Sequence, residues 1–63
     1  MDLRTARKQA DLTISEVARR LGVTRQTIYN WEAGKTKMTV NTIIQLADLY
    51  GLHISDLLSG IKY

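Results

Sequence analysis

Apolar residues recur along the chain with the spacing of amphipathic helices, in five short groups separated by turn residues. The groups predict helices over residues 2–10, 14–21, 25–33, 40–50 and 54–58. No proline interrupts them, and no segment alternates between apolar and polar positions as a half-buried strand would. The pattern therefore predicts an all-α fold, a compact bundle of five helices that forms one domain over residues 1–63.

The segment 14–33 carries the clearest start and stop signals. Thr13 and Glu16 have the spacing of a capping box, in which each side chain accepts a hydrogen bond from the other residue's amide. Gly22 stands where a left-handed residue ends a helix, and Thr24 is a good N-cap for the next one. Two helices joined by so tight a turn must cross steeply, which predicts a helix-turn-helix. Its inward positions would be Val17, Ala18, Leu21, Val23, Ile28 and Trp31.

The other helices are expected to complete the core, with Leu12 as a plug after the first. Trp31 is expected inside and not as a stacking platform, because its spacing from Ile28 turns it inward. The remaining positions spaced for burial are Leu3, Ala6 and Ala10, then Val40, Ile43, Ile44, Leu46, Ala47 and Tyr50, and finally Ile54, Leu57 and Leu58.

The outward face of the third helix is polar but almost uncharged, unlike an ordinary solvated face of lysine and glutamate. Gln26, Tyr29 and Asn30 cluster opposite the buried direction, and Arg25 lies at the N-terminal edge. Such long or planar polar side chains can reach the edges of DNA bases. The alternatives are a solvated first turn for Arg25 and Gln26, and an idle surface tyrosine for Tyr29.

Composition excludes several other classes of protein. The chain of 63 residues has no cysteine and one histidine, His53, so neither disulfides nor a metal site with ligand spacing is expected. No nucleophile–base pair or carboxylate pair suggests an enzyme, and no cofactor or small-molecule ligand is indicated. Without an apolar run of roughly 18 residues or a signal-like start, the expected location is the cytoplasm, away from membranes.

Positive charge is concentrated in the first part of the chain. Residues 1–37 hold eight lysines and arginines against four acids, whereas residues 38–63 hold one lysine against two acids. Residues 34–38 form a basic loop that includes Lys35 and Lys37, although plain solubility charges are the alternative interpretation. The basic end of the molecule, from residues 1–37, would face DNA phosphates, and the other end, from residues 38–63, would face protein.

The same segment resembles a known family. With Ile14 as the first position, Ala18 is fifth, Gly22 ninth and Ile28 fifteenth, and the residues WEAGK follow at 31–35. Together with Leu46-Ala47, Gly51 and Leu57-Leu58, this set is similar to the phage repressor and Cro-type family, also called the Xre family, over nearly the whole chain. The resemblance implies a five-helix domain that binds operator double-stranded DNA as a two-fold dimer, with the third helix in the major groove.

The resemblance also implies roles for individual residues. Arg25 would pair with guanine and Gln26 with adenine, while Tyr29 would meet a thymine methyl and Asn30 a base or a phosphate. Phosphate contacts would come from Thr13, Ser15, Lys35, Thr36 and Lys37.

The family pattern also implies a role for two further residues of this chain, whereas two other residues differ from the pattern. Arg7 and Glu32 would form a partly buried ion pair between the first and third helices. Ile14 departs from the glutamine common at its position, which removes a hydrogen bond there, and His53 replaces the usual serine-type cap.

Four apolar residues at the other pole are the candidates for a dimer contact: Leu49, Leu52, Leu58 and Ile61. Completion of the core is the alternative for them. Together these features predict a small transcriptional regulator, most simply a repressor that binds a palindromic operator as a homodimer. An antitoxin-like interaction module, or the DNA-binding piece of a longer sensor regulator, stays open as the alternative.

Overall fold

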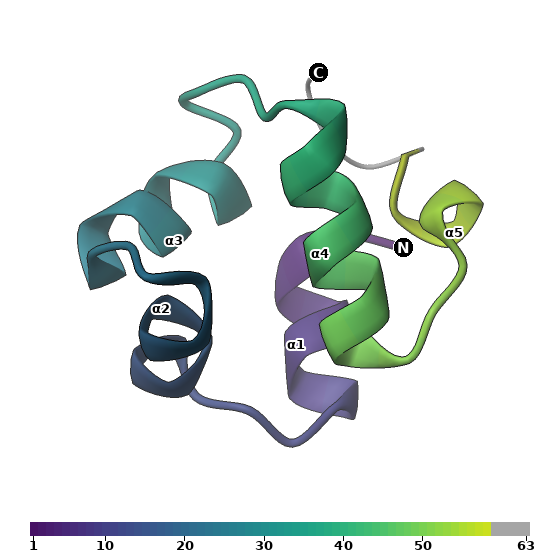
Figure 1. Cartoon of the computed structure of the whole chain (residues 1–63), viewed down its shortest axis with the longest axis horizontal. Coiled ribbons are helices and arrows are strands. Elements are labelled where there is room, and N and C mark those ends of the chain that lie inside the picture. Colours follow the sequence, from purple (N-terminus) through teal and green to yellow (C-terminus); the bar gives the residue numbers. More distant parts are fainter. Residues whose placement is uncertain (59–63) are drawn as a thin grey trace.

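The computed structural model describes residues 1–58, and this part of the chain contains five α-helices (Figure 1). The helices are α1 (Leu3–Gln9), α2 (Ile14–Leu21), α3 (Arg25–Glu32), α4 (Val40–Tyr50) and α5 (Ile54–Leu58). The first helix is one residue shorter at each end than predicted, and the third ends one residue earlier, with Ala33 as its C-cap. The all-α prediction is confirmed.

Polar side chains fix where the helices begin. Four helices have a cap that accepts a hydrogen bond from the amide three residues later: Asp2, Thr13, Thr24 and Thr39. At α2 the capping box is complete, because the Glu16 amide donates to Thr13 Oγ1 at 3.1 Å and the Thr13 amide donates to Glu16 Oε1 at 3.0 Å. Gly22 and Gly51 end α2 and α4 in the left-handed conformation. The turn between α2 and α3 is therefore fixed on both sides.

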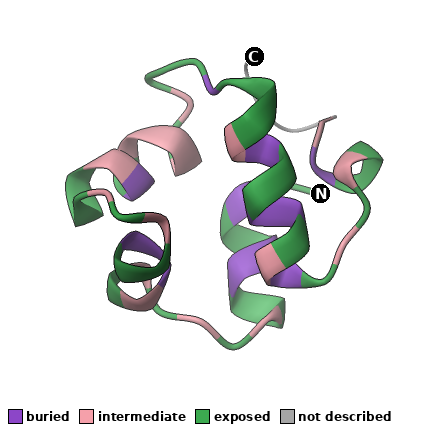
Figure 2. Cartoon of the chain, viewed as in Figure 1, coloured by how far each residue is buried: buried purple, intermediate pink, exposed green. Residues whose placement is uncertain are grey.

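Helix α4 occupies the middle of the molecule, with α1 and α5 packed against it (Figure 1). The α2–α3 pair lies to one side and joins the rest through contacts between α1 and α3. Buried positions of α4 form a stripe along the helix, while other positions of the same helix are exposed (Figure 2). The apolar core consists of Leu3, Ala6, Val17, Ala18, Ile28, Met38, Ile43, Leu46, Ala47, Tyr50 and Leu57.

Two residues of α4 were predicted to be buried and are not. The exposed fractions of Val40 and Ile44 are 54% and 48%. The buried stripe of α4 runs through Ile43, Leu46 and Tyr50, and at 100° per residue Val40 and Ile44 lie beyond its margin. The apolar pattern of α4 is thus wider than the side of the helix that its neighbours cover.

Met38 is the opposite case, because it lies in the segment predicted as a basic loop but is only 5% exposed. Its side chain belongs to the same buried cluster as Ile43 and Leu46. Sequence periodicity misses such a residue, since a single apolar side chain in a loop has no period. Met38 fixes the end of the loop that carries Lys35 and Lys37 to the body of the protein.

Several residues are half-buried against the core instead of fully inside it. Trp31 is one of them, so its predicted inward direction holds while its burial is partial. Leu49, Leu52 and Leu58, the candidates for a dimer contact, are also half-buried and packed on the core. Ile61, the fourth candidate, lies outside the described residues. Core completion therefore accounts for part of the apolar surface at this pole.

Within residues 1–58, no helix has both the length and the apolar character needed to cross a membrane.

Gly22 provides a test of the turn. An added Cβ would meet no atom within 4 Å, so the cost of Gly22→Ala comes from the backbone alone, at φ +69°. We expect the free energy of unfolding to fall by about 1–2 kcal/mol, measured by urea denaturation. Gln9→Ala, at an exposed position of α1, is the control and should change stability little. An unchanged stability for Gly22→Ala would mean that the turn tolerates another conformation.

Candidate nucleic-acid interface

Helix α3 presents a polar outer surface, which we call the reading face and define as Arg25, Gln26, Tyr29 and Asn30. Arg25, Gln26 and Tyr29 are exposed, and Tyr29 keeps 55% of its surface accessible. Asn30 is half-buried. On the opposite side of α3, Ile28 is 1% exposed and anchors the helix to the core. The structure thus places all four residues on one side of a helix whose other side is held in place.

Two residues of the reading face are already bonded to each other. The Gln26 Nε2 group donates a hydrogen bond to Asn30 Oδ1 at 3.0 Å, across one helical turn. This bond uses one of the two Nε2 hydrogens and leaves Gln26 Oε1 as an acceptor. A donor and an acceptor therefore remain on Gln26, which is the pair that a bidentate contact with adenine requires.

The start of α2 contributes polar groups next to α3. Thr13 and Ser15 are exposed there. Hydrogen bonds with Thr13, first to its backbone and then to its side chain, hold the pKa of Glu16 below its ordinary value. Glu16 is therefore ionised at neutral pH and keeps the capping box closed.

The loop after α3 contributes the basic side of the surface. Lys35, Thr36 and Lys37 are all exposed. The Lys35 amide donates to the Asn30 carbonyl oxygen at 2.9 Å, which ties the beginning of the loop to the end of α3. With Met38 buried at the other end, both ends of this short loop are anchored. The two lysines consequently project from a fixed position beside the reading face.

An ion pair joins α1 to α3. Arg7 Nε donates to Glu32 Oε2 at 2.7 Å and Arg7 Nη2 donates to Glu32 Oε1 at 3.4 Å, with side-chain exposures of 10% and 9%. Arg7 Nη1 also donates to the Leu12 carbonyl oxygen at 3.0 Å. The hydrogen bond to Glu32 raises the pKa of Arg7 further above its ordinary value. This arrangement holds α3 against α1 and also ties in the turn that follows α1.

Tyr50 of α4 lies in the electrostatic field of this pair. Burial, together with the negative charge of Glu32, raises the pKa of Tyr50 to about 12, and the positive charge of Arg7 opposes the shift. Tyr50 is consequently neutral at physiological pH. Its ring is part of the core.

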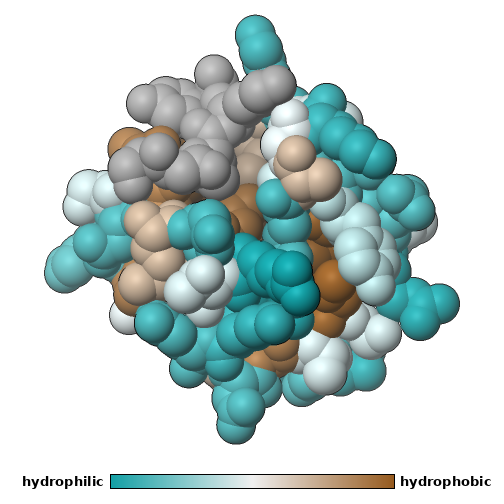
Figure 3. All heavy atoms as spheres, turned by 180° about the vertical axis from the view of Figure 1, so that it is seen from behind, coloured by the Kyte–Doolittle hydropathy of each residue, from teal (hydrophilic) through white to brown (hydrophobic). Residues whose placement is uncertain are grey.

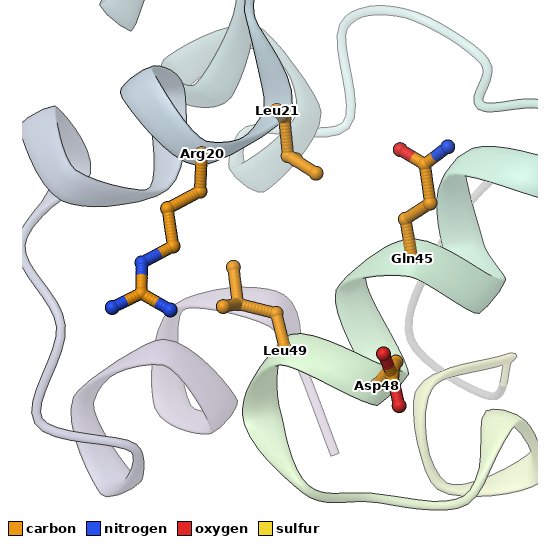
Figure 4. A pocket seen from close by; sticks show the side chains of 5 residues that line it. All are labelled: Arg20, Leu21, Gln45, Asp48 and Leu49. Carbon is orange, nitrogen blue, oxygen red and sulfur yellow. The ribbon is translucent and has the colours of Figure 1, made fainter.

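Among the open recesses beside the helix-turn-helix, two lie where it faces α1 and α4. One, which we call the α1–α3 recess, has a volume of about 480 Å³ and is lined by Arg4, Arg7, Ile14, Tyr29, Glu32 and Ala33. The other, the α2–α4 recess, is of similar volume and is lined by Arg20, Leu21, Gln45, Asp48 and Leu49 (Figure 4). Figure 3 shows the molecule from behind, and hydrophilic and hydrophobic residues lie side by side at the centre of the face in view.

Comparison with known proteins agrees with this geometry. The sequence profile of the family described as Helix-turn-helix matches residues 3–57. The chain belongs to this family, in its Cro/C1-type or Xre form. Its members are DNA-binding transcriptional regulators. The resemblance inferred from the motif is therefore confirmed.

Two curated relatives are similar over most of the chain. One is a protein of Sulfurisphaera tokodaii with the provisional name of an HTH-type transcriptional regulatory protein, 36% identical over 62 residues, which are 97% of this chain and 21% of that protein. The other, from Pyrobaculum aerophilum and provisionally named in the same way, is 36% identical over 53 residues, 84% of this chain and 21% of that protein. The chain spans about a fifth of the length of each. No solved structure gives a significant match.

The sequence patterns gave no role to Arg4, which lines the α1–α3 recess together with Tyr29. Helical periodicity shows that Arg4 points outward but not which neighbour it meets. Within residues 1–58 no group of three or more histidine, cysteine or acidic residues could hold a metal ion.

The Arg7–Glu32 pair can be tested by a double-mutant cycle. Arg7→Ala alone and Glu32→Ala alone leave the other charge in a largely buried site, so each should lower the free energy of unfolding by about 3 kcal/mol. The double variant should lose clearly less than the sum of the two, because no unpaired charge remains. Urea denaturation of the four proteins measures this coupling, and strictly additive losses would contradict the pairing.

Tyr50 gives a pH-dependent prediction. The unfolded chain releases the tyrosine proton near pH 10, before the folded chain does, so stability falls as pH rises from about 10 through 12. The loss should approach roughly 2–3 kcal/mol. Tyr50→Phe removes the pH-dependent loss of stability that is due to Tyr50. The contribution of lysines that titrate in the same range is common to both proteins and cancels when their pH profiles are compared. Equal pH profiles for wild type and Tyr50→Phe would contradict the shift.

Proposed function

We propose that this chain is a sequence-specific reader of double-stranded DNA and that it represses transcription from a palindromic operator, as a homodimer and without a cofactor. The observation that carries the proposal is the reading face: four polar residues on one side of a capped and anchored helix, two of them bonded to each other. In this proposal α3 enters the major groove, and its first two turns contact base edges.

Base recognition is divided among the residues of the reading face. Arg25 pairs with guanine through its planar guanidinium, and Gln26 pairs with adenine through Oε1 and the remaining Nε2 hydrogen. Tyr29 packs against a thymine methyl. Asn30, half-buried and bonded to Gln26, orients that side chain as well as facing the groove.

Phosphate contacts flank the reading face on two sides. Thr13 and Ser15 lie at the start of α2, where the helix dipole favours a negative charge. Lys35, Thr36 and Lys37 lie in the anchored loop after α3. These contacts set the position of α3 on the duplex and give the binding its salt dependence.

Dimer formation in this proposal uses the C-terminal pole, through the accessible parts of Leu49, Leu52 and Leu58 together with Ile61. Two recognition helices would then lie about 34 Å apart to meet successive major grooves. The length of the curated relatives favours a second form of the proposal, in which these five helices serve as the DNA-binding part of a longer regulator in the cytoplasm.

The roles of Gln26 and Lys35 can be separated by experiment. DNA sequences bound by the wild type are first selected from a random pool. Gln26→Ala should then relax the preference at one base pair, at a cost of about 1–3 kcal/mol for the preferred base, with little change in salt dependence. Lys35→Ala should weaken binding to all sequences alike and reduce the slope of log K against log salt by about 1.

The same measurements can refute the proposal. A uniform loss across sequences for Gln26→Ala would remove it as a base reader. Selection that yields only scattered, salt-sensitive binding would favour an interaction module, in which a partner protein copurifies with the chain. Sedimentation of the complex with a selected duplex gives the number of chains bound per site.

A further inference from the structure

The α1–α3 recess lies directly beside the reading face, because Tyr29 belongs to both. Its walls differ in chemistry. Ile14, at the start of α2, contributes an apolar wall, Tyr29 an aromatic one, and two arginines from α1 provide positive charge. DNA bound by Tyr29 would therefore lie close to this recess.

The two arginines of the recess are not equivalent. Arg7 is already engaged, because Glu32 and the Leu12 carbonyl oxygen accept hydrogen bonds from its guanidinium. Arg4 is exposed, and its guanidinium makes no hydrogen bond or ion pair within residues 1–58. The carboxylate of Asp2 accepts the Thr5 amide at 2.8 Å and interacts with the charge of Arg4 without forming an ion pair with it. The charge available to a ligand in this recess is therefore that of Arg4.

We propose that the α1–α3 recess seats one sugar–phosphate unit of the DNA backbone, with Arg4 on the phosphate and Ile14 against the deoxyribose. The inference rests on the proposed function and adds a contact beside Tyr29 to the phosphate contacts proposed for the start of α2 and for the loop after α3. A sugar–phosphate unit has one charged end and one largely apolar face, which matches the two kinds of wall. In this arrangement Ile14 contributes an apolar contact with the deoxyribose, although it cannot donate a hydrogen bond.

The α2–α4 recess offers a contrast within the same molecule. It has a similar volume and also contains an arginine, Arg20, but Asp48 shares its lining (Figure 4). Each recess contains one carboxylate, but Glu32 in the α1–α3 recess is paired with Arg7, whereas Asp48 forms no salt bridge within residues 1–58 and so opposes a phosphate. No residue of the reading face belongs to the α2–α4 recess. Arg20→Gln therefore changes the net charge as Arg4→Gln does, but at a recess that is not expected to meet DNA.

The test compares Arg4→Gln, Arg4→Lys and Arg20→Gln on a duplex selected by the wild type. For Arg4→Gln, the slope of log K against log salt should fall by about 1, and affinity at about 0.1 M salt should fall roughly tenfold. Arg4→Lys keeps the charge and should restore most of the slope. Arg20→Gln should stay close to the wild type, and the base preference of all three should be unchanged.

A second measurement locates the contact on the DNA. Duplexes carry one uncharged methylphosphonate at each backbone position in turn. The wild type should lose affinity at a phosphate next to the base pair read by Tyr29, and Arg4→Gln should show no further loss there. Thermal unfolding of each variant checks that the fold is intact.

Distinct outcomes overturn the inference and the function on which it rests. An unchanged salt slope for Arg4→Gln, while Lys35→Ala still lowers it, removes the recess as a backbone site and leaves the DNA reader in place. A changed base preference for Arg4→Gln makes Arg4 a base reader, which also overturns the inference. Failure of the wild type to select any sequence rejects the proposed function itself.

Discussion

The ion pair between Arg7 and Glu32 is the interaction on which the arrangement of this protein depends. It is nearly buried, so its charges lose most of their hydration, and their mutual attraction compensates only because the geometry supplies three hydrogen bonds. Such a pair contributes less net stability than its distance suggests. It does penalise every arrangement in which α1 and α3 are displaced, since displacement leaves a charge buried without a partner.

The reading face follows from this constraint. Helix α3 has only eight residues, too few to be stable in isolation, and its position is set by what surrounds it. Thr24 caps its first turn, Ile28 anchors its middle, and Glu32 holds its last turn to α1. With these three points fixed on the inner side, the outer side is free to vary in sequence without loss of the fold. A reader of DNA sequence needs this separation between residues that hold the helix and residues that face outward.

Local signals in the sequence predicted most of the fold, whereas contacts between distant segments escaped them. Caps and left-handed glycines act over three or four residues, and all the helix boundaries were found within about one residue. Burial of Val40, Ile44 and Met38 depends on which neighbour covers each side chain. The apolar pattern was wrong for Val40 and Ile44, and it made no prediction for Met38. The reading face could be predicted because it lies on one helix. The recess that Arg4 and Tyr29 line together could not be predicted, since it lies between two helices whose relative position no local pattern encodes.

The hydrogen bond from Gln26 to Asn30 has a consequence for how such a protein can change its specificity. A side chain that is held before binding loses less rotational freedom when it meets its base, so part of the entropic cost is met during folding. The same bond makes positions 26 and 30 interdependent, because a substitution at one changes the rotamers open to the other. In the proposed complex, new operator preferences would therefore arise through paired substitutions, and the effects of single substitutions at these two positions would not add.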